Sequence, residues 1–212
     1  MKKSMLKNGL LLGLFALLCT GLVAAVNQFT YDKIKQQEQI ELARVLHQLI
    51  PDEIHDNELT GHCILLNSAE FLGTDSSLPA YVATKDNKGV AIAIETIAPD
   101  GYNGNIRIIV GISDKGEVLG VRTLSHQETP GLGDKIELRK SDWVRSFDGL
   151  FLLSDEDKRW NVKKDGGDID QFTGATITPR AYVKAVRNAV SYFNANKAQL
   201  LSTPANCEVG NE

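Results

Sequence analysis

The chain opens with a long apolar segment and then places apolar side chains at helical spacing among polar ones. Residues 9–26 carry no charge and are rich in Leu and Ala, and a helix that spans a bilayer needs about 17–25 such residues. Residues 27–50 are amphipathic and stop before Pro51. The pattern predicts a membrane-spanning helix that continues as a stalk helix and packs on the following domain.

The middle of the chain predicts β-strands. Runs rich in Val and Ile are separated by turn residues at residues 81–84, 89–97, 106–112 and 118–123. A shorter apolar run at residues 63–66 is a candidate for another strand. Ser113-Asp114-Lys115-Gly116 is a hairpin signal, because Asp and Gly tolerate turn geometry. No long helical pattern separates these runs, so we expect an antiparallel sheet rather than parallel crossover units.

Helical patterns return after the strands. Residues 134–147 predict one or two short helices, with Trp143 and Phe147 on an apolar side; Trp143 is expected in the core. Thr178 is a suitable N-cap and Pro179 suits the first turn of a helix that continues to Phe193. The fold class is therefore α+β: an N-terminal transmembrane helix, then an antiparallel-sheet domain with flanking helices.

Charges around the apolar segment predict its orientation. Lys2, Lys3 and Lys7 precede it, which favours a cytoplasmic N-terminus and an exported domain, although Lys33 and Lys35 weaken this asymmetry. We expect residues 1–8 in the cytoplasm, 9–26 in the membrane, 27–50 as the stalk and 51–212 as the periplasmic domain.

Two other interpretations of the N-terminus compete with an uncleaved anchor. A signal peptide has the same basic start, but its apolar core is typically about 7–15 residues. A lipoprotein would use Cys19, yet Leu18 stands where a small residue is expected. The uncleaved anchor is the favoured interpretation.

Composition and cysteines narrow the class of protein. The 212 residues carry a formal net charge of -4 and no basic face, so we expect no nucleic-acid partner. Cys63 and Cys207 would meet an oxidising compartment and are either a disulfide or two unrelated thiols, since sequence does not give their separation.

Familiar catalytic and metal-binding patterns are missing. The sequence has no Gly-x-x-x-x-Gly-Lys-Ser/Thr loop, no Gly-x-Gly-x-x-Gly after a strand and no Gly-x-Ser-x-Gly elbow. His47, His55, His62 and His126 show no zinc or haem ligand spacing. We expect neither a catalytic residue nor a metal. His55 and His62 are expected on the surface, and His126 is expected to make a structural hydrogen bond rather than to transfer protons.

The residues before the last helix suggest a ligand. A helix that begins near Pro179 offers free N–H groups to a phosphate. Gly174 and Ala175 leave room beside the Thr176 hydroxyl, and the glycine loops 101–104 and 131–133 could admit a flat ring. The alternative is a capped helix beside two ordinary turns, and these residues alone do not exclude it.

A resemblance to a known family favours the ligand. Residues 170–176 read DQFTGAT and match the Asp-x-x-Ser/Thr-Gly-Ala-Thr pattern at which a flavin transferase attaches FMN to the last threonine. With DGYNG and HQETPGLGDKIELRKSDW, the chain resembles the FMN-binding domain family, which is shared by the G subunit of the Rnf/Rsx ion-translocating electron transport complex and the C subunit of the sodium-translocating NADH:quinone reductase. The anchor, the length, KKDGGDIDQFTGATITPRA and the outlying cysteines favour the Rnf/Rsx member.

The resemblance implies covalent FMN, held through a phosphoester to Thr176, and a role as an electron relay rather than a complete enzyme. The transferase would read a recognition frame of Asp170, Thr173, Gly174 and Ala175. The flavin would lie against Tyr102, Glu128, Thr129, Gly131 and Leu132. Asp170 could equally be a structural acid that accepts backbone hydrogen bonds.

Partners and location follow from the same resemblance. The implied partners are the other proteins of the Rnf/Rsx membrane complex, the flavin transferase and the lipid bilayer of the bacterial inner membrane. The alternatives are the C subunit of a sodium-translocating reductase and a non-redox, membrane-anchored binding module.

Overall fold

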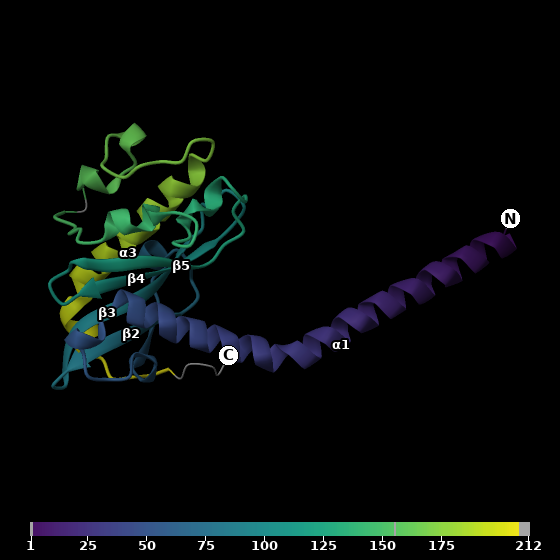
Figure 1. The fold of residues 1–212 in the computed structure, drawn as a ribbon, viewed down its shortest axis with the longest axis horizontal. Coiled ribbons are helices and arrows are strands. Elements are labelled where there is room, and N and C mark those ends of the chain that lie inside the picture. The colour runs from purple at the N-terminus through teal and green to yellow at the C-terminus, as the bar shows by residue number, and fades with distance from the viewer. Residues whose placement is uncertain (1, 155, 208–212) are drawn as a thin grey trace. The chain divides into compact units, whose positions relative to one another are not determined.

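The structure, a computed structural model, describes residues 2–154 and 156–207 and divides into the compact units Met1–Leu42 and Ala43–Glu212. Figure 1 shows its elements. The helices are α1 Lys2–Leu49, α2 Ala69–Leu72 and α3 Ile177–Ser202, and the strands are β1 Cys63–Leu66, β2 Leu78–Lys85, β3 Lys88–Ala98, β4 Ile106–Ser113 and β5 Val118–Ser125. Short 3-10 helices are η1 Asp52–Ile54, η2 Leu59–Gly61, η3 Gly133–Ile136, η4 Asp142–Phe147, η5 Lys158–Trp160 and η6 Lys163–Asp165.

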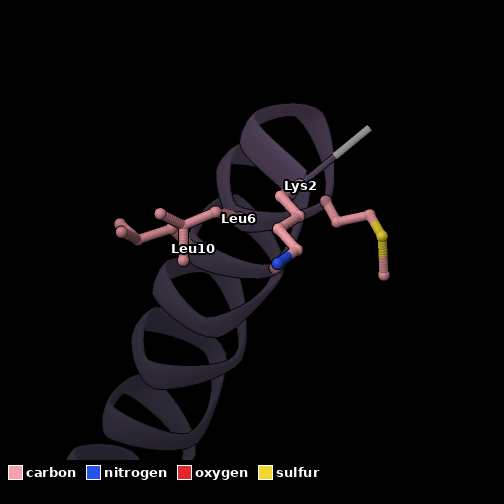
Figure 2. A pocket seen from close by; sticks show the side chains of 5 residues that line it. Lys2, Leu6 and Leu10 are labelled. Carbon is pink, nitrogen blue, oxygen red and sulfur yellow. The ribbon is translucent and has the colours of Figure 1, made fainter.

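Helix α1 is long and apolar enough to cross a membrane, and the side chains of its most apolar stretch are exposed in the described structure. A shallow hollow lies on this helix, where Lys2, Leu6 and Leu10 project from successive turns (Figure 2). One helix supplies all the residues that line it, so it is a gap between neighbouring side chains rather than an enclosed site. The helix ends before Pro51, as predicted.

The five strands form one antiparallel sheet in the order β1-β2-β3-β4-β5. This confirms the four predicted strands and the shorter candidate at residues 63–66. Asp86 and Asn87 join β2 to β3 with φ of 52° and 60°, the conformation of a type I′ hairpin turn. The predicted turn at Gly116, with φ of 88°, joins β4 to β5.

One face of the sheet packs on α3. Alternate residues of β4, at positions 106, 108, 110 and 112, are fully buried in a core shared with the α3 side chains Val186, Val190 and Phe193. Figure 1 shows α3 running behind the strands. The strand thus presents every second residue to this core and the helix about every fourth, as the geometry of each element requires.

The other face of the sheet receives the last turn of α1. Gly111 and Gly120 pair across β4 and β5, and a Cβ at either would lie 3.2 or 3.0 Å from a Leu49 side-chain atom. Leu46, Leu49 and Ile50 are buried there. Glycine thus permits the close approach, and the predicted packing of the residues before Pro51 on the domain is confirmed.

A disulfide joins Cys63 at the start of β1 to Cys207 in the C-terminal tail, with a Cα–Cα distance of 5.3 Å. Backbone hydrogen bonds from Asn206 and Cys207 to the Cys63 carbonyl hold the tail beside this strand. Of the two alternatives, a disulfide or two unrelated thiols, the disulfide is therefore correct. It links two cysteines that are 144 positions apart in the sequence.

Candidate functional site

The expected acceptor, Thr176, lies at the N-terminus of α3. The helix begins at Ile177, so Thr176 is the N-cap, and its side chain makes no capping hydrogen bond within the described residues. The prediction that Thr178 caps the helix is wrong: Thr178 lies inside the first turn and is buried. Its hydroxyl donates instead to Glu128 Oε2 at 2.5 Å. Pro179 occupies the first turn, as predicted.

A tight turn precedes the acceptor. The Ala175 N–H donates to the Phe172 carbonyl at 3.3 Å, and Gly174 has φ of 84°. A positive φ at the third position of a β-turn is a conformation that glycine supplies without strain. Thr173 and Gly174 are exposed, so the turn is accessible from solvent.

Glu128 is the centre of the site and is only 5% exposed. Its carboxylate accepts hydrogen bonds from the Thr178 hydroxyl and, at 3.2 Å, from the Asn103 N–H. A Cβ on Gly101 or Gly133 would lie within 3.0 Å of the same carboxylate. One buried acid therefore holds together the loop 101–104, the loop 128–133 and the start of α3, three segments far apart in sequence.

The loop after Glu128 is closed by its own backbone. The N–H groups of Leu132 and Gly133 donate to the Thr129 carbonyl at 3.2 and 3.0 Å, and Gly131 has φ of 76°. The Gly131 N–H donates to Asp134 and lowers the pKa of that carboxyl below its ordinary value, with Lys140 also contributing. The loop lies next to the turn before the acceptor, because a Cβ on Gly174 would lie 3.2 Å from Leu132 Cδ2.

The loop 101–104 is the third segment of the site, beside the loop 128–133 and the start of α3. The Asn103 side chain donates to the Gln127 carbonyl at 2.7 Å, which ties this loop to the residues before Glu128. Tyr102 is 66% exposed. Among the described residues, no heavy atom lies within 4 Å of a Cβ placed on Gly104 or Gly131, so the space beside both glycines is open.

Asp170 is exposed, and its carboxylate lies 2.7 Å from Lys163 Nζ. Its carbonyl accepts the indole N–H of Trp143 at 2.6 Å. Trp143 is buried, as predicted, and packs edge-on against Phe172. The aromatic core thus fixes the backbone at both ends of the segment 170–172, just before the turn.

His126 has the structural role expected of it. Its Nδ1 accepts the Glu128 N–H at 3.0 Å, so its proton lies on Nε2, which faces Glu137 Oε1 at 2.9 Å. The Glu137 carboxylate also accepts from Arg139, and this bond is the main reason that the pKa of Glu137 is lowered. Both ring nitrogens are therefore engaged in holding the loop.

Sequence reasoning named most of the residues that these three loops bring together, but it missed the hydrogen bonds by which Asn103 and Thr178 meet Glu128. The three segments share no periodicity or spacing, so their contact is a property of the folded sheet. The one local signal for this contact was an acid, Glu128, inside a glycine-rich loop. If such an acid is buried, it must accept hydrogen bonds from other segments.

An apolar helix long enough to cross a membrane is followed by a small α+β domain whose sequence places the chain in the class of FMN-binding-domain proteins. Residues 101–191 match the FMN-binding domain family, and residues 1–49 match the RnfG N-terminal region. Three proteins named as the G subunit of an ion-translocating oxidoreductase complex are similar throughout. Those of Shewanella piezotolerans, Shewanella oneidensis and Vibrio parahaemolyticus are 77%, 70% and 56% identical.

The alignments cover 100%, 98% and 97% of this chain and the same shares of the three relatives. The chain therefore belongs to the RnfG family, the G subunits of ion-translocating oxidoreductase complexes. This confirms the resemblance to the Rnf/Rsx member rather than to the sodium-translocating reductase.

Proposed function

We propose that this protein is the membrane-anchored electron-relay subunit of an Rnf-type ion-translocating complex and carries FMN as a phosphoester on Thr176. The observation that carries the proposal is the position of Thr176 at the N-terminus of a 26-residue helix, where its hydroxyl makes no capping hydrogen bond within the described residues. The chain that contains it belongs to the RnfG family. FMN, when bound, supplies reversible electron transfer. The chain positions the flavin ring and tunes its reduction potential.

The residues present fit a phosphoester at this position. The free N–H groups and positive dipole end of a helix N-terminus favour a phosphate. The phosphoester is Thr176 plus FMN minus one water, with the O–H bond of Thr176 replaced by an O–P bond. This costs the fold no capping bond, because the hydroxyl makes none within the described residues. The exposed turn at Thr173 and Gly174, with the exposed Asp170, is accessible to a flavin transferase.

The surroundings also fit a flat apolar ring. Tyr102, Leu132 and Ile177 are large apolar side chains that remain 66%, 42% and 46% exposed on the three segments held by Glu128. A bound ring would cover them, with Thr129 and the bare backbone of Gly131 beside it. Glu128 itself turns inward to Thr178 and Asn103, so we assign it the task of fixing the loops.

The anchor determines where the relay works. We propose residues 1–8 in the cytoplasm, 9–26 as a single span, 27–50 as the stalk and 51–212 in the periplasm. The Cys63–Cys207 disulfide supports an oxidising compartment for the domain. A covalent link suits that location, since a flavin outside the compartment that makes it would otherwise be lost by dissociation.

The test is coexpression of the full-length protein with a flavin transferase, followed by a denaturing gel viewed for flavin fluorescence. The wild-type band should fluoresce and the Thr176→Ala band should not. The control Thr60→Ala, on η2 and bonded only to the exposed Glu58 side chain in the described structure, should retain the signal. A dark wild-type band would indicate instead a non-redox, membrane-anchored binding module, and fluorescence in Thr176→Ala would refute the assigned acceptor.

A further inference from the structure

Three side chains with metal-binding atoms meet where α1 ends, far along the chain from the flavin loops. They are His47 in the last turn of α1, Asp52 at the start of η1 and His55 just after it. One ligand atom from each lies within 4.8 Å of the other two. The His47 and His55 rings are 6.2 Å apart and inclined by 34°.

His55 has an unusual environment for a histidine that the sequence placed on the surface. Its side chain is only 5% exposed, so the surface prediction is wrong. Its Nδ1 lies 2.9 Å from the Asn57 carbonyl, which can only accept, so Nδ1 carries the proton. The Nε2 lone pair is buried without a hydrogen-bond partner among the described residues, which is a costly arrangement unless something binds there.

That lone pair is close to the other two residues. His55 Nε2 lies 3.7 Å from Asp52 Oδ1, and the same oxygen is 2.6 Å from His47 Nδ1. Ligand atoms around a tetrahedral zinc ion, with bonds of about 2.0–2.1 Å, are about 3.3 Å apart. The two distances bracket this value, so a cation could enter after a small movement of the exposed Asp52 and His47 side chains.

The turn that carries His55 is fixed on the sheet. The Asp56 N–H donates to the Thr84 carbonyl at 2.8 Å, and the Asn57 side chain accepts from the Thr84 N–H and donates to the Val82 carbonyl. A ligating histidine whose other nitrogen donates to a backbone carbonyl is held in one tautomer and orientation. His55 is therefore preorganised as a ligand.

We propose that His47, Asp52 and His55 form a binding site for a divalent cation of the zinc class, with water in the fourth position. Two imidazoles and one carboxylate suit Zn²⁺, Co²⁺, Ni²⁺ or Cu²⁺ rather than Mg²⁺ or Ca²⁺, which prefer oxygen ligands. The bound ion would join the last turn of α1 to η1 and fasten the end of that helix to the sheet.

The test uses full-length protein in detergent, purified without a histidine tag and stripped with a chelator. Zn²⁺ is titrated in competition with a chromophoric chelator, and Co²⁺ is added separately to look for the visible bands of a tetrahedral site. We expect one Zn²⁺ per chain. Loss of a second-shell partner typically weakens metal binding about 10–100-fold, so His55→Gln and His47→Gln, which each remove a ligand itself, should weaken it by at least about 100-fold.

The matched control is His62→Gln, because His62 is also partly buried and faces a backbone carbonyl, that of Thr203. It should bind Zn²⁺ like the wild type. If His55→Gln does not fold, His47→Gln decides the matter, since His47 is 43% exposed. Unchanged binding in His47→Gln, equal weakening in His62→Gln, or no binding to the wild type would overturn the proposal and leave a plain His47–Asp52 hydrogen bond.

Discussion

Removing the carboxylate of Glu128 should loosen the whole flavin site, because this one group joins three loops. Glu128→Ala leaves the buried Thr178 hydroxyl and the Asn103 N–H without their acceptor. A hydrogen bond to a charged group contributes about 1.5–3 kcal/mol, and relief of the cost of burying the charge offsets part of the loss. We expect a net loss of about 2–4 kcal/mol in the free energy of unfolding.

That loss corresponds to a fall in melting temperature of about 5–15 °C, at about 2–4 °C per kcal/mol for a chain of this size. Glu128→Gln preserves the shape and one oxygen acceptor, so it should cost about 1 kcal/mol. Flavin-free protein in detergent is heated while tryptophan fluorescence is followed. Trp143 and Trp160 are the two tryptophans of the chain, and both lie in the domain core, so the signal reports the domain and not α1.

Two controls make the result interpretable. Glu58→Ala changes an exposed acid whose partner is the side chain of Thr60, and it should shift stability by no more than about 0.5 kcal/mol. Thr178→Val removes the same hydrogen bond from its other end, so Glu128→Ala and Thr178→Val should be non-additive when combined. Additive effects, or a Glu128→Ala loss no larger than that of Glu58→Ala, would refute the central role of Glu128.

Three further expectations concern the same domain. Reducing the Cys63–Cys207 disulfide should lower stability by about 2–4 kcal/mol, as measured by melting with and without reductant; equal melting temperatures would contradict this. Trp143→Phe should slow flavin attachment, measured as in-gel fluorescence against time, because the segment before the acceptor loses its indole hydrogen bond; the control Trp160→Phe, whose lost bond goes to the Phe151 carbonyl and not to that segment, should not. Because the folded pKa of Asp134 is lowered, its stabilisation is present above about pH 4 and lost as pH falls below it; acid unfolding of Asp134→Asn should show a shallower decline there, and identical profiles would exclude the effect.

The sheet was predictable because each of its segments carries its own local signal. The Val- and Ile-rich run of β4 and the hairpin at Gly116 are each recognisable from residues a few positions apart, and the same holds for the apolar face of α3. The N-cap was misplaced by two residues because Thr178 has the right chemistry for a cap. Tertiary contact with Glu128 instead draws its hydroxyl into the core.

Contacts between distant segments were not predictable. Glu128 and Thr178 are 50 positions apart, and nothing in either local sequence indicates that they meet. The spacing of His47 and His55 matches no zinc-site pattern, because the end of α1, Pro51 and a 3-10 helix lie between them. Their contact therefore depends on how the chain turns there. The sequence left the pairing of Cys63 and Cys207 undecided for the same reason, since the two residues become neighbours only when the tail pairs with β1.

Mass spectrometry of one tryptic peptide tests the covalent flavin most directly. Cleavage after Lys164 and Arg180 releases residues 165–180, which contain Thr173, Thr176 and Thr178. In protein purified from membranes that also contain the transferase, this peptide should be heavier by FMN minus one water, and backbone fragmentation should place the added mass on Thr176. An unmodified peptide, or the added mass on Thr173 or Thr178, would contradict the proposed attachment.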